Sequence, residues 1–158
     1  MRAALRLLAE EGLDQAWARH RRNAEMLWSG LESLGLSMHV PADRRLPTLT
    51  TVRIPEGVDG KAFSQQLLNN HGIEVGGGLG TLAGKIWRIG LMGYNSTPEN
   101  VSRLLNLFET ELPRFSDSPA ALLEPAFQLL LSLISPYALN HIHAVVCTCM
   151  GGEIKASP

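Results

Sequence analysis

The sequence predicts an α+β fold in which helices pack on one face of a small, mostly antiparallel sheet. Three observations support this prediction. The expected elements follow one another as helix, helix, strand, helix, strand, strand and helix, an order that cannot build a doubly wound parallel sheet. The helical stretches end at glycine or proline, and the strand candidates are short. A chain of 158 residues, 45% of them hydrophobic, suits one domain with a tail, which excludes a two-domain enzyme.

Two helices are expected at the start of the chain. Apolar residues recur at helical spacing over residues 3–8, and Gly12 ends this short helix. Asp14 is expected to cap a longer helix that ends at Gly35. The buried stripe of the longer helix consists of Trp17, Ala24, Leu27, Trp28, Leu31 and Leu34. Four residues on its other faces are expected to be solvated: Arg19, Arg21, Arg22 and Glu25.

Three short segments are predicted strands, over residues 48–54, 73–75 and 86–91. Thr, Val and Ile dominate the first segment, and prolines bracket it on both sides. A glycine-rich turn at residues 76–80 separates the second segment from the third. The two later strands therefore flank a turn.

Two further helices have recognisable ends. Asp59 is expected to cap a helix over residues 61–70 that ends at Gly72. Thr97 is the expected cap of the last helix, where Pro98 takes the first helical position. Pro113 ends that helix. The apolar stripes are Ala62, Phe63 and Leu67 in the first helix, and Val101, Leu104, Leu105, Phe108 and Leu112 in the second.

Charge and cysteine usage exclude several classes of protein. Lys and Arg number 14 against 15 Asp and Glu, without a basic cluster, so nucleic acid is not expected as a partner. Cys147 and Cys149 are the only cysteines, which favours a reducing compartment over a disulfide scaffold. Glu10 and Glu11 interrupt the apolar start where a signal peptide would continue, so we expect no cleavable targeting segment.

The character of the sequence changes after Pro113. Residues 125–152 contain no Asp, Glu, Lys or Arg, yet the apolar stretch at 126–139 is shorter than the ~20 residues that span a bilayer, so no membrane helix is expected. Four residues in this part have side chains that can bind a metal. In an extended strand the first and the last of them would lie roughly 26 Å apart, so a zinc site is not expected without an intervening turn. These four residues are His141, His143, Cys147 and Cys149.

The glycine-rich turn resembles two nucleotide-binding motifs without satisfying either. Gly78, Gly80 and Ala83 match the dinucleotide fingerprint, but the next strand begins at Ile86 and leaves no room for the helix that the fingerprint needs. A P-loop fails because Leu79 replaces its first glycine and Ile86 its Ser or Thr. The turn instead indicates a backbone that needs positive φ or close approach by a substrate or another chain.

Arg88 is the candidate binding residue. Alternation along residues 86–91 places it between Ile86 and Gly90, on the face opposite the core-facing Trp87, Ile89 and Leu91. Because Gly90 has no side chain, a ligand has room beside the guanidinium, whose two parallel donors match a carboxylate. A structural ion pair or a solvent-facing arginine is the alternative.

Four motifs carry a resemblance to a known family. They are RLPT at residues 45–48, TTV at 50–52, GGLG at 77–80 and GKIWRIGLMGYNST at 84–97. In this order and spacing they closely resemble the C-terminal domain of the alanine–glyoxylate (serine–pyruvate) aminotransferases, over residues 2–112. By this resemblance, residues 1–113 form the small domain of a fold type I pyridoxal-phosphate enzyme. Residues 114–158 form an unrelated apolar tail, helical or disordered.

The resemblance implies a homodimeric class V aminotransferase that uses pyridoxal 5'-phosphate. Such an enzyme moves an amino group from alanine or serine to glyoxylate or pyruvate, which removes glyoxylate and forms glycine. The implied partners are therefore small amino acids and oxo acids. By the match of the Arg-Ile-Gly motif, Arg88 is the arginine that binds the substrate carboxylate. The implied location is the peroxisome, with the mitochondrion as the alternative, although no targeting signal is recognisable.

The catalytic residues of the family have no counterpart in this sequence. A pyridoxal enzyme needs a lysine for the internal Schiff base and an acid beside the pyridinium nitrogen. The only lysines of the sequence are Lys61, Lys85 and Lys155, and none of them matches the position of the family's Schiff-base lysine. We therefore expect no catalytic, cofactor-binding or metal-binding residue here, and an inactive isolated chain. Met1 is interpreted as an internal methionine of a longer protein. The alternative is a truncated, noncatalytic isoform or interaction module.

Overall fold

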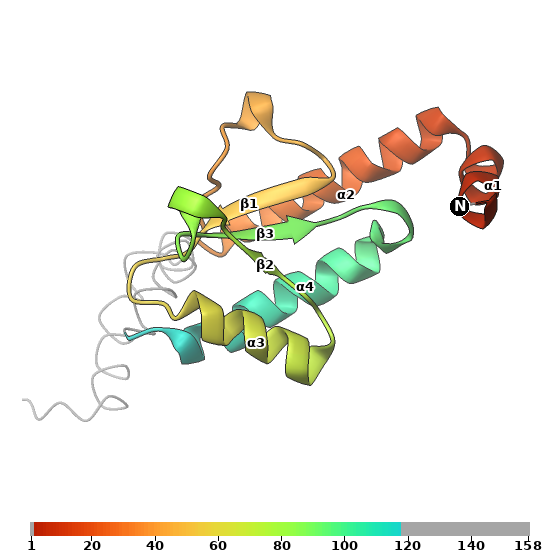
Figure 1. Cartoon of the computed structure of the whole chain (residues 1–158). Helices are drawn as coiled ribbons and strands as arrows, with labels where there is room; N and C mark the ends of the chain where they lie inside the picture. Colours follow the sequence, from red (N-terminus) through yellow and green to blue (C-terminus); the bar gives the residue numbers. More distant parts are fainter. Residues whose placement is uncertain (1, 118–158) are drawn as a thin grey trace, which may run out of the picture.

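The computed structural model describes residues 2–117, which form the predicted α+β fold (Figure 1). The helices and strands follow one another as α1 (Arg2–Glu11), α2 (Leu13–Ser33), β1 (Leu49–Arg53), α3 (Gly60–His71), β2 (Gly76–Gly77), β3 (Ile86–Gly90) and α4 (Pro98–Glu111). Four short 3-10 turns complete this part of the chain: η1 (Ala42–Arg44), η2 (Gly80–Leu82), η3 (Gly93–Asn95) and η4 (Leu112–Phe115).

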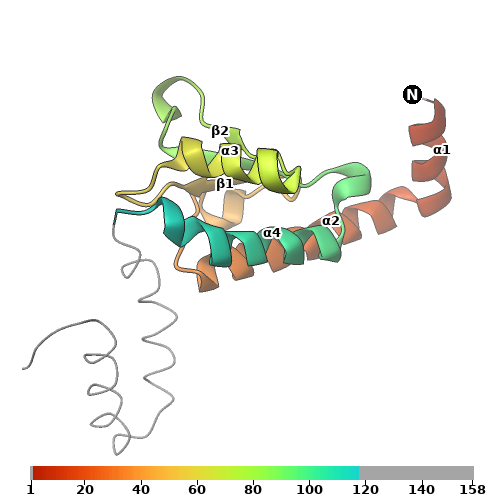
Figure 2. The ribbon, with the colours of Figure 1, turned by 90° about the horizontal axis from the view of Figure 1, so that it is seen from below.

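The sheet has three strands in the order β1-β3-β2. Both pairs are antiparallel, and in the middle of the sheet Thr51, Arg88 and Gly76 lie side by side in register. The last strand in the sequence, β3, is therefore the central one. Helices α2 and α4 lie alongside each other (Figure 2), and the core fills the space between the helices and one face of the sheet.

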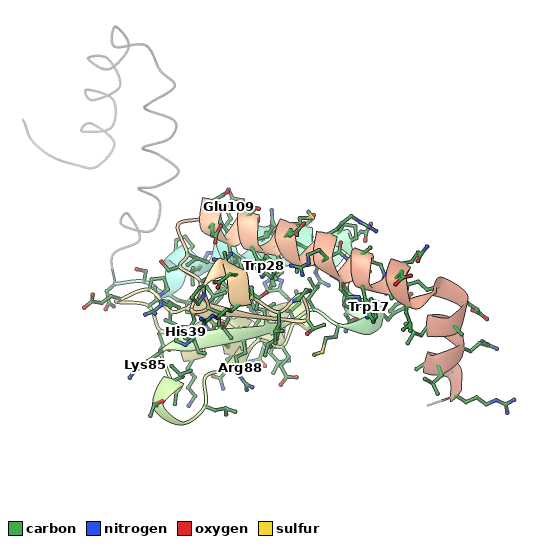
Figure 3. The ribbon with its side chains drawn as sticks, turned by 90° about the horizontal axis from the view of Figure 1, so that it is seen from above. Trp17, Trp28, His39, Lys85, Arg88 and Glu109 are labelled. Carbon is green, nitrogen blue, oxygen red and sulfur yellow. The ribbon has the colours of Figure 1, made fainter. Side chains whose placement is uncertain are left out.

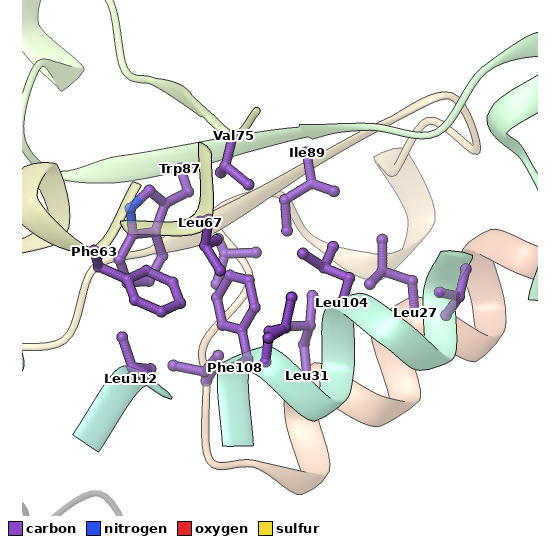
Figure 4. Close-up of a cluster of buried hydrophobic side chains, with 14 of the residues drawn as sticks. Leu27, Leu31, Phe63, Leu67, Val75, Trp87, Ile89, Leu104, Phe108 and Leu112 are labelled. Atoms are coloured by element: carbon purple, nitrogen blue, oxygen red, sulfur yellow. The ribbon is translucent and has the colours of Figure 1, made fainter. Parts of the chain in front are cut away.

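An aromatic cluster forms the centre of this core (Figure 4). The ring centroids of Phe63 and Phe108 are 5.0 Å apart, and those of Trp87 and Phe108 are 5.5 Å apart, both edge to face. Each such pair stabilises the fold by about 0.5–1.5 kcal/mol beyond the area it buries. The indole Nε1 of Trp87 donates a hydrogen bond to the carbonyl of Gly60 at 3.0 Å. Strand β3 is thereby tied to the start of α3.

Local signals placed most helix ends correctly. Asp59 caps α3 by accepting hydrogen bonds from the backbone N–H groups of Lys61 and Ala62, and Gly72 ends the helix in the left-handed conformation. Thr97 caps α4 through the N–H of Asn100. These side chains lie within three residues of the groups that they bind, so sequence alone can predict the bonds.

The predicted beginning of α2 was wrong. Asp14 lies inside the first turn, and the N-cap is Gly12, which has φ +86° and makes no side-chain cap. The positive φ of Gly12 interrupts the helical backbone there, and α2 begins two residues earlier than predicted. Trp17, expected in the buried stripe, is 66% exposed. Figure 1 shows that the first turns of α2 extend past the ends of the strands.

The second strand is also displaced from its prediction. Residues 73–75 belong to no strand, and β2 consists of Gly76 and Gly77, which the sequence analysis places in the turn. Glycine weakens strand propensity, but the backbone of β3 supplies a pairing partner that local sequence does not reveal. The turn itself falls later, at Gly80 and Gly84, both with positive φ. As expected, only a short 3-10 turn, and no long helix, follows Gly78.

The packed structure continues past Pro113. Phe115 packs against the core, and its carbonyl accepts a hydrogen bond from the N–H of Asp59 at 2.9 Å. Asp117 donates to the carbonyl of Gly57. The division of the chain between residues 113 and 114 stays a prediction.

The predicted tail properties, including those of His141, His143, Cys147 and Cys149, concern residues outside the described part. Within residues 2–117, no helix is long and apolar enough to span a bilayer. The same part of the chain contains no group of three or more metal-ligating side chains.

Candidate functional site

Arg88 lies at the middle of the central strand and points away from the helices (Figure 3). Its neighbours Trp87 and Ile89 are 1% and 4% exposed and face the core, as the predicted alternation requires. Arg88 itself is half-buried. Across the sheet it is flanked by Thr51 on β1 and Gly76 on β2.

One hydrogen bond anchors the guanidinium. Its Nε donates to the carbonyl of Gly77 at 2.7 Å. Neither Nη1 nor Nη2 has a hydrogen-bond partner among residues 2–117, and no carboxylate in this part of the chain lies within ion-pair distance of Arg88. Two of the three nitrogens can therefore bind an anion from outside.

The other half-buried arginines of the described chain already have carboxylate partners. Arg19 pairs with Glu11 at 2.6 Å, and Arg45 pairs with Glu32 at 2.8 Å. Taking a charge partly out of water without a partner is unfavourable, which is why such groups are usually paired. Of the half-buried Lys and Arg side chains among residues 2–117, Arg88 alone lacks a carboxylate. This difference distinguishes it from a structural ion pair.

The surroundings of Arg88 leave the outer face of the sheet open. Gly76 and Gly90 contribute no side chains, and Thr51 adds only a small one. The turn after β2 lies beside this face and covers Ile86, which is 3% exposed. A β-carbon at Gly78 would overlap the backbone of Leu82, so the turn can pack this tightly only with glycine there.

A separate hydrogen-bond network holds the loop that follows β3. Asn23 donates to the carbonyl of Ser96 at 2.7 Å, and Arg19 donates to the same carbonyl at 2.7 Å and to that of Gly93 at 2.9 Å. The N–H of Gly93 donates to Nε2 of His20 at 2.9 Å. The first turns of α2 therefore fix the exit of the strand that carries Arg88.

The expectation that Arg19 would be solvated was wrong, whereas Arg21, Arg22 and Glu25 are exposed as expected. Arg19 forms two hydrogen bonds with the carboxylate of Glu11. These bonds lower the pKa of Glu11 and raise the pKa of Arg19. Sequence reasoning missed the network because its partners are up to 77 residues apart.

A cavity lies beside the end of β3 that β2 does not pair with, and Arg88 does not line this cavity. This cavity, of about 460 Å³, is lined by Gly90, Asn95 and Arg103 among others. The site around Arg88 is instead an open surface, which offers binding groups from one side only.

Comparison with known proteins assigns the fold. No protein-family model matches the chain. The alanine–glyoxylate aminotransferase of Felis catus is 42% identical over 118 residues, which is 73% of this chain and 28% of the cat protein. The crystal structure of an alanine–glyoxylate aminotransferase from Nostoc matches with a TM-score of 0.67 and 62% identity, covering 68% of this chain and 29% of that one. The chain is a partial homologue of the alanine–glyoxylate aminotransferase family.

A second glyoxylate aminotransferase matches comparably. The ureidoglycine–glyoxylate aminotransferase of Bacillus subtilis has a TM-score of 0.68 and 38% identity, covering 79% of this chain and 33% of that one. These comparisons confirm both the predicted family and the predicted α+β fold. The chain spans between a quarter and a third of the length of the relatives that it matches.

The described residues do not fit the pyridoxal phosphate that the family uses. Lys61 and Lys85 are both exposed, one in the first turn of α3 and the other before β3. The cavity that Lys61 lines contains no Asp or Glu that could hold a pyridinium nitrogen. Lys155 lies outside the described residues. Residues 2–117 thus do not provide a complete cofactor site.

Proposed function

We propose that this chain is the small C-terminal domain of a pyridoxal-phosphate aminotransferase that moves an amino group from alanine or serine to glyoxylate or pyruvate. Its own contribution is Arg88, which binds the substrate carboxylate. The observation that carries this proposal is the half-buried guanidinium with no carboxylate partner in residues 2–117. The motif match at Arg-Ile-Gly supports the same role.

The chemistry of the two substrates explains why one arginine suffices. The amino donor and the oxo acid both carry a carboxylate beside the reacting carbon, so the same group can hold each in turn. A guanidinium forms two parallel hydrogen bonds to a carboxylate and fixes its plane as well as its position. Arg88 thereby orients the reacting carbon, whereas the cofactor and its lysine come from outside the described residues.

The remaining features of the family belong to the same proposal. A homodimer supplies the complete active site, and the peroxisome is the location, with the mitochondrion as the alternative. The open surface around Arg88 supports an arrangement in which another part of the protein closes the site.

Titration of the chain with pyruvate tests the role of Arg88. A charge-assisted contact of about 1.5–3 kcal/mol corresponds to a dissociation constant of roughly 10–100 mM for the isolated site. We expect pyruvate to shift the Nη signals of Arg88 and the signals of Thr51, and methyl pyruvate, which lacks the charge, to shift none of them.

Arg53→Ala is the matched control for Arg88→Ala in this titration. Arg53 lies on the same face of the sheet, is exposed, and has no ion-pair partner among the described residues. We expect Arg88→Ala to abolish pyruvate binding and Arg53→Ala to preserve it. Equal loss in both variants would mean that pyruvate senses only the general positive charge of the face, and the proposed role would be wrong.

The absence of a fitting lysine among the described residues favours a second candidate, a noncatalytic isoform. Such a chain would share the carboxylate site but would never form a Schiff base with pyridoxal phosphate. Activity decides between the two candidates, since transamination by an assembly that contains this chain would exclude the noncatalytic one.

A further inference from the structure

The strand beside Arg88 consists only of glycine. Gly76 pairs with Arg88 in register, and Gly77 pairs with Trp87. A β-carbon at Gly76 would lie 3.4 Å from Nη2 of Arg88 and 3.8 Å from its β-carbon, whereas a β-carbon at Gly77 would meet nothing within 4 Å. Neither glycine has a positive φ. At Gly76 a β-carbon would already be in van der Waals contact with the guanidinium, so the space beside Arg88, and not the backbone conformation, limits the size of the side chain at this position.

The hydrogen bond to Gly77 determines which edge of the guanidinium is available. The planar guanidinium has a side edge, formed by Nε and Nη2, and an end edge, formed by Nη1 and Nη2. The carbonyl of Gly77 accepts a hydrogen bond from Nε of Arg88 at 2.7 Å, so the side edge faces β2. The end edge has no partner among residues 2–117. A carboxylate can form two parallel hydrogen bonds with this edge.

We propose, on the basis of the carboxylate-binding function above, that Gly76 and Gly77 are positioning residues for Arg88. The carbonyl of Gly77 fixes Nε, and the missing side chain of Gly76 leaves Nη2 free, so that the substrate carboxylate binds end-on through Nη1 and Nη2. A side chain at position 76 would stand on the same face beside the guanidinium. Gly76 thus also limits the space next to the bound carboxylate.

The NMR signals of the arginine side chain test the orientation directly in the 158-residue chain. The Nε–H signal of Arg88 is identified by its loss in Arg88→Lys. We expect this proton to exchange with water more slowly than that of the exposed Arg53, and its signal to stay in place when pyruvate is added, while the Nη signals move. An Nε–H that exchanges as fast as that of Arg53, or that moves as far as the Nη signals, would overturn the end-on orientation.

Substitution of Gly76, with Arg53→Ala as the control, provides the matched test. We expect Gly76→Val to raise the pyruvate dissociation constant about tenfold, because the displaced guanidinium loses one of its two parallel hydrogen bonds. Gly76→Ala should raise it about two- to threefold, whereas Arg53→Ala, an alanine substitution on the same face of the sheet but outside the proposed site, should leave it unchanged. The backbone NMR spectrum away from β2 verifies that each variant folds. If Gly76→Val does not fold, the pyruvate dissociation constants of the two alanine variants decide whether Gly76 positions Arg88.

The outcomes separate this inference from the proposed function. Pyruvate binding that is independent of Arg88 in the wild-type chain would overturn the proposed function and this inference with it. Binding that depends on Arg88 but is equal in Gly76→Ala, Arg53→Ala and the wild type would overturn only the positioning role of Gly76. The expected result is Arg88-dependent binding that weakens with the size of the side chain at position 76.

Discussion

The substitution Trp87→Phe tests the alternation that directs Arg88 outward. Trp87 is 1% exposed, and its indole donates a hydrogen bond to Gly60. Phenylalanine keeps the aromatic contacts with Phe63 and Phe108 but removes this donor, while the carbonyl of Gly60 still accepts a hydrogen bond from the hydroxyl of Ser64 at 2.9 Å. Loss of this hydrogen bond costs about 0.5–1.5 kcal/mol, and the smaller ring adds the cost of a cavity in the core. We expect a total of about 2–3 kcal/mol.

Calorimetry measures this effect as a shift in melting temperature. For a domain of this length the entropy of unfolding is about 0.25 kcal/mol per kelvin, so Trp87→Phe should lower Tm by about 8–12 °C. Trp17→Phe is the control, since Trp17 is 66% exposed and should change Tm by less than about 2 °C. Equal shifts in the two variants would refute the assignment of Trp87 to the core face and, with it, the outward direction of Arg88.

Three further predictions concern the helices and the cofactor. Glu11 has a pKa below its ordinary value because Arg19 binds its charged form, so this bond stabilises the fold at neutral pH and its contribution is lost as pH falls through the lowered pKa. The difference in stability between the wild type and Glu11→Gln should therefore vanish in acid. A difference that persists or grows in acid would contradict this prediction. Gly72→Ala should destabilise the chain by about 1 kcal/mol in chemical denaturation, because φ is +66° while a β-carbon would meet nothing, whereas Gly77→Ala should have little effect. Pyridoxal phosphate added to the isolated chain should give no stable Schiff-base absorption band that borohydride abolishes, and a site-specific band on one lysine would show that a fitting amine is present.

Sequence predicted the features that depend on neighbouring residues. The caps Asp59 and Thr97 bind backbone groups three or fewer residues away, and the direction of Arg88 follows from the two-residue period of a strand. The α+β class followed from the order of such local elements.

The features that sequence missed depend on distant parts of the chain. The glycines of β2 form a strand only because β3 pairs with them. Arg19 is held by Ser96, 77 residues away, and Trp17 is exposed because the strands do not reach that end of α2. The bond between Arg88 and Gly77 likewise spans a turn whose shape no local signal specified.

The most direct test of the central claim is the affinity of pyruvate for three forms of position 88. A carboxylate held by a planar, two-donor guanidinium should bind best to the wild-type Arg88, weakly to Arg88→Lys, whose ammonium lacks the fork, and not at all to Arg88→Ala. We expect this order of dissociation constants when they are measured by NMR titration at one ionic strength. Equal affinity in the wild type and Arg88→Ala would contradict it.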